Sequence, residues 1–275
     1  MVKQRSKVDA PHRSFKRSYR KDYLREVPVP GIAEHITKTF SILAKNRRLF
    51  LPFLAIVVVI GIATVGLSGV VDQVSDGIFA ALLFLIIWLV TIFILRHTMA
   101  KNKITLRDAM YNAMTPLLSV FVVLAVVALQ CLPIVLLIVA YSSAVETDFL
   151  KMPFYALLFF VFAILMILLS GYMLSSSLIA LVAVSAPGLY PIAALKNASD
   201  LMIGQRIKFV IRLIALTILV VLVWAVIILP LRVIGVPGIV LSIAQAIAFC
   251  VCMIYISAYL YLYYRWILEA ENMLK

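Results

Sequence analysis

Apolar and polar positions follow one another along the chain in long blocks, and six of the apolar blocks hold no charged residue. All 25 Lys and Arg and all 12 Asp and Glu lie outside these blocks. A helix needs about 20 apolar residues to cross a hydrocarbon core of about 30 Å, and each block has about that length or more. The blocks are residues 49–71, 77–95, 109–145, 152–195, 213–231 and 233–264.

The six blocks predict six transmembrane helices joined as three hairpins. The third and fourth blocks exceed one crossing, so we trim both, and we expect Pro133 to bend the third helix. The fourth is expected to be one long, tilted helix that continues through Ser185, because a seventh crossing would move the following basic loop to the other side. The predicted fold is all-α and polytopic, with spans near residues 49–71, 77–96, 117–141, 154–178, 209–231 and 238–264.

Each hairpin is preceded by a short amphipathic segment that we expect to lie in the cytoplasmic interface plane. The second of these segments begins with a capping box at Thr105, and the third begins at Pro191 and ends at Gly204. A shift of 159 positions pairs the first segment with the third, which indicates an internal repeat. The expected apolar stripes are Ile32, Ile36, Phe40 and Leu43, then Leu106, Met110, Ala113 and Leu117, then Ile192, Leu195, Ala198 and Met202.

Two of these segments resemble parts of a known family. The sequence SAPGLYPIAALKNASDLMIGQRIKFVIRL, residues 185–213, resembles the elbow and following span of the membrane-domain family attached to some glycerophosphoryl diester phosphodiesterases, and of related six-span bacterial membrane proteins of unknown role. Residues 36–53, ITKTFSILAKNRRLFLPF, look like a first copy of that element. The resemblance covers roughly residues 32–265 and implies a six-span membrane domain. Ala186 and Pro187 stand where the family often has an acidic residue, and the soluble phosphodiesterase domain has no counterpart, so the resemblance implies no activity.

Basic residues gather on one side of the predicted spans. Residues 1–48 hold 13 Lys and Arg against four acids, and 23 of the 25 cations fall on the side of the two termini. Lys and Arg near span ends are retained in the cytoplasm, so we expect both termini there and the protein in the cell inner membrane. The expected organisation is a disordered basic tail at residues 1–30, a membrane domain at 31–265 and a short cytoplasmic end at 266–275.

The basic tail suggests a partner at the membrane surface. It can bind anionic lipid with about 1 kcal/mol for each basic residue near the headgroups, and a tail that only enforces orientation is an equal alternative. Nucleic acid is not expected, because the membrane already lies beside the tail. The expected contacts to anionic headgroups are Lys16, Arg17, Arg20, Lys21, Arg47 and Arg48.

The residues that usually carry chemistry do not form a recognisable constellation. His12, His35 and His97 are not clustered with acids at any known spacing, and we expect all three to be solvated at the interface. Cys250 and Cys252 are two positions apart and point about 200° apart on a helix, so they cannot hold one metal ion together. We therefore expect no cofactor, no metal and no enzymatic activity.

Mild polar residues within the spans leave two interpretations open. They line a polar cavity, or they hydrogen-bond between helices and to their own carbonyls at about 0.6 kcal/mol each, which we favour. The cavity residues would be Gln130, Ser175, Ser176, Ser177 and Gln245. A further set at the end of the last span predicts an aromatic belt at the interface: Tyr255, Tyr259, Tyr261, Tyr263, Tyr264 and Trp266.

These observations favour a non-enzymatic integral membrane protein that organises membrane lipids or partner proteins, among them a second copy of itself. A channel or transporter for a small or amphipathic solute is the first alternative. An accessory membrane subunit of a separately encoded enzyme is the second, and it rests on the family resemblance alone. No ionisable residue lies at the middle of a predicted span, so coupling to an ion gradient is not expected.

Overall fold

The computed structural model describes residues 30–67, 73–147, 151–186 and 188–272. Within these ranges the chain forms nine helices and no strand, which confirms the predicted all-α class. The tail predicted at residues 1–30 lies outside the described ranges apart from Pro30.

Six of the described helices are long and apolar enough to cross a membrane, as predicted. Consecutive members contact each other in the pairs α3–α4, α6–α7 and α9–α10. The six helices are α3 (Arg47–Leu67), α4 (Gln73–Met99), α6 (Leu117–Glu146), α7 (Pro153–Val184), α9 (Arg206–Val233) and α10 (Gly238–Asn272).

The helix ends differ from the predicted spans because an apolar run marks only the part of a helix that can lie inside lipid. α6 runs to Glu146 and α10 to Asn272, beyond the positions at which the predicted spans stop. α7 is one continuous helix of 32 residues, as expected, and its C-cap is Ser185. Pro133 lies inside α6 without ending it, and the bend expected there stays a prediction.

Three short helices precede the three pairs at the predicted places, namely α2 (Ile32–Lys45), α5 (Leu106–Ala113) and α8 (Pro191–Leu201). The Thr105 side-chain oxygen caps α5 by accepting a hydrogen bond from the backbone N–H of Asp108 at 3.2 Å. Pro191 is the first residue of α8, where its missing N–H needs no partner. Gly204 follows with a φ of 83°, a left-handed conformation that glycine adopts without strain, and the chain turns there into α9.

The predicted apolar stripes describe the packed faces of α2 and α8 only in part. In α2 the buried residues are His35 and Thr39, whereas Phe40 is 68% exposed. At α8 the predicted Ala198 and Met202 are buried, whereas Ile192 is 81% exposed. Lipid chains are as apolar as leucine, so hydrophobicity does not decide which side of such a helix packs against protein. Small or hydrogen-bonding residues take part of each packed face, and the large side chains of Phe40 and Ile192 face outward.

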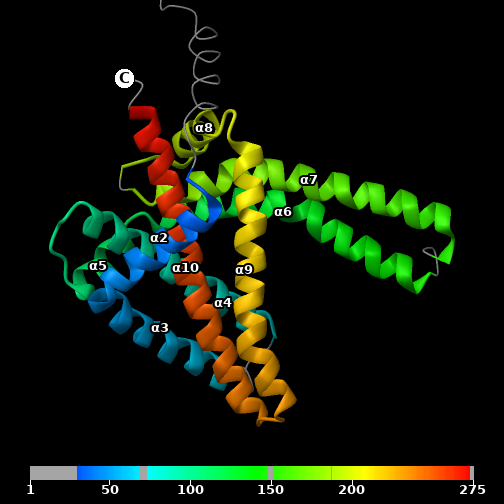
Figure 1. Cartoon of the computed structure of the whole chain (residues 1–275), viewed down its shortest axis with the longest axis horizontal. Coiled ribbons are helices and arrows are strands. Elements are labelled where there is room, and N and C mark those ends of the chain that lie inside the picture. The colour runs from blue at the N-terminus through cyan, green and yellow to red at the C-terminus, as the bar shows by residue number, and fades with distance from the viewer. Residues whose placement is uncertain (1–29, 68–72, 148–150, 187, 273–275) are drawn as a thin grey trace, which may run out of the picture.

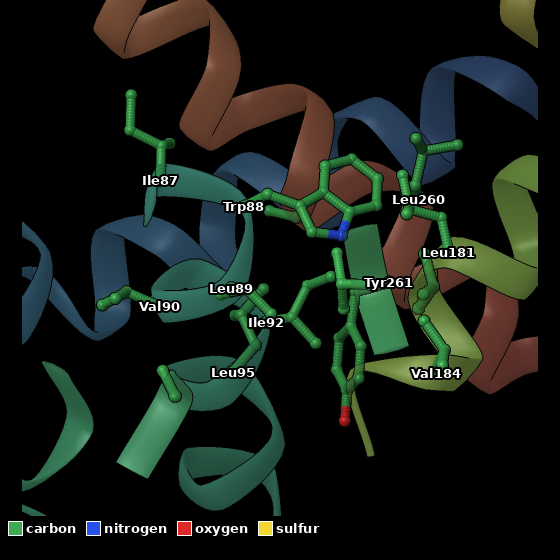
Figure 2. Packing of buried hydrophobic residues seen from close by; sticks show 14 of the residues in the cluster. Ile87, Trp88, Leu89, Val90, Ile92, Leu95, Leu181, Val184, Leu260 and Tyr261 are labelled. Atoms are coloured by element: carbon green, nitrogen blue, oxygen red, sulfur yellow. The ribbon is translucent and has the colours of Figure 1, made fainter. Parts of the chain in front are cut away.

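The buried core lies where α4, α10 and the second half of α7 meet. Figure 2 shows the Trp88 indole of α4 beside Leu260 and Tyr261 of α10, with Leu181 and Val184 of α7 on the opposite side of Tyr261. The apolar segment of α4 is 56% buried, the highest share among the six long helices. α10 contacts α2, α3, α4, α7 and α9, so the last helix of the chain is the centre of the packing.

The α6–α7 pair has a different environment. Figure 1 shows the pair extending away from the other helices, across the direction of α9 and α10. Only 6% of an 18-residue apolar segment of each helix is buried, although the second half of α7 lies in the core. Helices in lipid have no hydrophobic drive to associate, because lipid chains solvate apolar side chains as well as protein does. The pair can therefore stand apart once its own two helices are packed together.

Candidate functional site

A group of basic and aromatic side chains is enclosed where α2, α9 and α10 meet. We call it the Arg212 cluster, and its members are His35 of α2, Phe209 and Arg212 of α9, and Tyr259 and Tyr263 of α10. None of the five is more than 5% exposed. Pairs three or four positions apart share one helix face, which is why α9 and α10 each contribute two side chains to the same place. Figure 1 shows α2 lying across α10 in this region.

His35 joins the first described helix to the last one. Its Nε2 lies 3.3 Å from the backbone carbonyl oxygen of Tyr259, and since a carbonyl can only accept, Nε2 carries the proton and donates. The imidazole is edge-on to the rings of Tyr259 and Tyr263, with centroids 4.5 and 6.1 Å apart. The Thr39 hydroxyl donates to the His35 carbonyl at 2.8 Å.

The prediction that His35 is solvated is therefore wrong. Its partner lies 224 positions away, and no local pattern reports such a contact. His97 is half-buried at the end of α4, with its ring stacked on Phe93 at 4.1 Å, so it is not fully solvated either. His12 lies outside the described residues.

Arg212 carries a positive charge into the protein interior. Its Nη2 donates to the carbonyl of Pro30, and its guanidinium carbon lies 5.3 Å from the centre of the Tyr263 ring, a cation–π arrangement. No ion pair joins Arg212 to an Asp or Glu among the described residues. Sequence reasoning counted Arg212 only among the cations on the side of the termini, at the start of the fifth predicted span, and missed the cluster. The available signal was its spacing from Phe209 and Leu216, which puts the charge on the buried stripe of α9.

Three polar atoms of the Arg212 cluster are buried without a hydrogen-bond partner. They are Nη1 of Arg212 and the hydroxyl oxygens of Tyr259 and Tyr263. All three groups can donate a hydrogen bond, and leaving a buried donor unpaired costs about 1–3 kcal/mol. The guanidinium can only donate, whereas each phenol hydroxyl can donate or accept, and the Tyr259 hydroxyl lies within hydrogen-bonding reach of Arg212.

Burial lowers the pKa of His35 from its ordinary value of 6.5. The positive charges of Arg212 and Lys38 lower that pKa further, whereas the hydrogen bond to the Tyr259 carbonyl and the charge of Glu34 oppose the shift. The imidazole is therefore neutral near pH 7. A proton on Nδ1 would place a second positive charge beside Arg212.

The predicted aromatic belt at the end of α10 is wrong for its central members. Tyr259, Tyr261 and Tyr263 are buried in the helix packing, and none of the six aromatic residues is exposed. The Tyr255 hydroxyl donates to the carbonyl of Ile36 in α2 at 3.2 Å. Since α10 is surrounded by five other helices, its tyrosines meet protein where an outer helix would meet headgroups.

The residues proposed to line a polar cavity come from three helices, α6, α7 and α10. Gln130 of α6 is beside α7, because its carbonyl accepts a hydrogen bond from Ser170 at 2.7 Å, and its side-chain oxygen is buried without a partner. Gln245 is half-buried on α10. Leu260 of α10 packs against the second half of α7. At a rise of about 1.5 Å per residue, Gln245 lies about 22 Å from Leu260 along the helix.

The serines of α7 bond within their own helix. Ser175 donates to the carbonyl of Tyr172 at 2.7 Å and Ser176 to that of Met173 at 3.1 Å, while Ser177 is buried. Hydrogen bonds to the carbonyls of the same helix are what the sequence analysis favoured over a polar cavity. The polar cavity itself stays a hypothesis.

Of the residues expected to bind anionic lipid, Arg47 and Arg48 lie exposed at the start of α3. The other four, Lys16, Arg17, Arg20 and Lys21, lie outside the described residues.

An apolar cavity of about 200 Å³ lies between α9 and α10. Its walls include Ala244, Ala248 and Cys252 of α10. Val223 and Ile227 of α9, at 41% exposed each, form part of its rim, so the cavity opens toward the outer surface. Across the described residues, no group of three or more His, Cys, Asp or Glu side chains is placed to hold a metal ion.

The six apolar helices define the class of the molecule: the chain is an all-α, polytopic membrane protein. Comparison with protein-family models gives no match, a search of curated proteins gives none, and a search of solved structures gives none. Function must therefore be argued from the surfaces and the cluster described above.

Proposed function

We propose that this chain is a non-enzymatic, multi-pass protein of the cell inner membrane that organises lipids or partner proteins around its α6–α7 pair. The observation that carries the proposal is the exposed apolar surface of these two helices, since only 6% of an 18-residue apolar segment of each is buried. In a membrane, lipid chains or other membrane helices must cover such a surface. A pair that extends sideways offers more of it than a pair enclosed in a bundle would.

Photo-crosslinking in native membranes tests this proposal. A crosslinking side chain at Leu136 of α6 or Phe160 of α7, which are 59% and 62% exposed, is expected to capture lipid or another protein. The same group at Leu181, which is 1% exposed, is the control and should capture neither. Recovery of the chain only as a lone monomer, indifferent to anionic lipid and without crosslinks, would contradict the proposal.

We further propose that both termini face the cytoplasm and that α2, α5 and α8 lie at the cytoplasmic interface. The support is the distribution of charge, with 23 of 25 cations on one side of the spans. Lys101 and Lys208 are exposed, so cysteines at these positions can be reached by a membrane-impermeant thiol reagent. Labelling is expected only in inverted vesicles, and labelling of intact cells would overturn the orientation.

A channel or transporter is the second candidate, favoured by one observation. Gln130 lies on a membrane-length helix, and its side-chain oxygen is buried without a hydrogen-bond partner. Such an oxygen is available to accept a hydrogen bond from a polar solute. Solute flux into liposomes tests this function, and Gln130→Leu with Gln245→Leu should abolish flux if these residues line the route.

The role of accessory subunit to a separate enzyme rests on the family resemblance. Co-purification with a phosphodiesterase would support that role, and phosphodiesterase activity of the chain alone would refute the non-enzymatic assignment.

A further inference from the structure

We infer that the Arg212 cluster binds the phosphate of an anionic phospholipid, and that an acyl chain of that lipid occupies the apolar cavity between α9 and α10. This inference rests on the proposed role in organising lipid and names the site and the class of lipid.

The first argument is the unbalanced charge of the Arg212 cluster. Arg212 is only 5% exposed, and no carboxylate pairs with it among the described residues. A buried charge without a counter-charge is strongly destabilising, because it has lost its water without gaining a partner. A phosphodiester carries one negative charge, so it would neutralise the guanidinium.

The second argument is the set of free donors. Nη1 of Arg212 and the Tyr263 hydroxyl lack hydrogen-bond partners, and the Tyr259 hydroxyl lies within reach of Arg212. All three groups can donate to phosphate oxygens, which only accept. His35 offers no free N–H at neutral pH, because its Nε2–H is bonded to the Tyr259 carbonyl. Donors around one cation fit a phosphate. An anionic lipid brings that phosphate without a second positive charge, whereas the quaternary ammonium of phosphatidylcholine would add a cation to a site that already holds Arg212.

The third argument is depth in the membrane. The 28 residues of α9 measure about 42 Å, so about 6 Å at each end extends beyond a 30 Å hydrocarbon core. Arg212 is the seventh residue of α9, close to this boundary, and its long side chain can reach the headgroup level. Lipid phosphates lie at that level.

The fourth argument is that the Arg212 cluster and the cavity lie along the same faces of α9 and α10. On α9, Val223 and Ile227 lie within about 60° of Arg212 around the helix, and on α10, Cys252 lies within about 20° of Tyr259. The phosphate site and the cavity therefore share one face of each helix. The cavity wall is apolar and its rim is open, which suits an acyl chain that enters from the surrounding lipid.

Native mass spectrometry of the full chain in detergent tests the inference. The wild-type protein is expected to retain phosphatidylglycerol at least tenfold better than phosphatidylcholine, and Arg212→Gln should remove this preference. Lys208→Gln is the matched control, since it removes an equal charge from an exposed position on the same helix. Preference retained in Arg212→Gln, or lost equally in Lys208→Gln, would overturn the site.

A second variant serves if Arg212→Gln does not fold. Tyr259→Phe with Tyr263→Phe keeps both rings and removes two donors, so retention of phosphatidylglycerol should drop several-fold, and unchanged retention would overturn the site. Excess inorganic phosphate should not displace the lipid, and complete displacement would show a site for free phosphate. If the wild-type chain retains no anionic lipid, the proposed lipid-organising role fails too. If it retains the lipid but Arg212→Gln does so equally, only the Arg212 site fails.

Discussion

His35 and Arg212 show, at the scale of single residues, how two polar side chains connect distant parts of the chain. His35 bonds to a carbonyl 224 positions away, and Arg212 bonds to a carbonyl 182 positions away. Both contacts involve the start of α2, so together they hold the first described helix against α9 and α10. Charge and protonation at these two positions should therefore control how firmly α2 is attached.

Acidification is expected to destabilise the folded protein through His35. The pKa of His35 is lowered in the folded state, so at pH values below 6.5 the unfolded chain binds more protons than the folded one. Stability should begin to fall as the pH drops through 6.5, and the loss should be complete below the folded-state pKa. Melting temperatures measured between about pH 8 and pH 5 check this. His35→Gln, which cannot titrate, should lose much less, and an equal loss in both proteins would contradict the prediction.

Gly61 sets the distance between α3 and its neighbours. A Cβ atom there would lie 3.7 Å from the Cys250 sulfur and 3.8 Å from Ala246 and Leu83, which is ordinary contact. Gly61→Ala should fit and stabilise α3 by up to about 1 kcal/mol through helix propensity. Gly61→Phe should overfill the contact and cost about 1–3 kcal/mol. Thermal unfolding of the two variants checks the order, and a stable Phe variant would show that α3 is not packed this way.

At the scale of elements, the short helices and the long helices obey different rules. The long helices follow from apolar length alone, whereas α5 depends on its cap and α2 on its contacts with α10. Cap chemistry is local, so Thr105 could be identified from the sequence. The packed face of α2 depends on a distant helix, so the stripe of Ile32, Ile36, Phe40 and Leu43 missed the buried His35 and Thr39 and included the exposed Phe40.

Loss of the Thr105 cap should loosen α5. Thr105→Ala removes the acceptor for the Asp108 amide and should cost about 1 kcal/mol, while Thr105→Ser retains the oxygen and should cost little. Hydrogen exchange of the α5 amides measures this local opening directly. Equal exchange in the Ala and Ser variants would mean that α5 is held by its packing alone.

At the scale of the whole molecule, the three helix pairs differ in how much of each is enclosed. The α3–α4 and α9–α10 pairs share the core around α10, and the α6–α7 pair extends to the side, joined to the rest chiefly through the second half of α7 (Figure 1). This division separates an internally packed body from a surface that only lipid or a partner can cover.

Deletion of residues 2–28 should leave membrane insertion and orientation intact. The cations Lys38, Lys45, Arg47 and Arg48 still flank the first span, and cations near span ends determine orientation. Reporter fusions at the C-terminus and in the segment between α3 and α4 check the result. Inverted reporters in the deletion variant would show that the tail is the orientation signal.

The sequence by itself determined the all-α class, the six membrane-length helices, the one short helix before each pair and the cap at Thr105. These features depend on the apolar length of each segment or on neighbours within one helical turn, so local composition specifies them. Only the tertiary structure decided that His35, Arg212 and the α10 tyrosines are buried together and that the α6–α7 pair stands apart. Lipid solvates apolar side chains as well as protein does, so hydrophobicity cannot choose between inward and outward faces. That choice is made by hydrogen bonds and close packing between segments far apart in the chain.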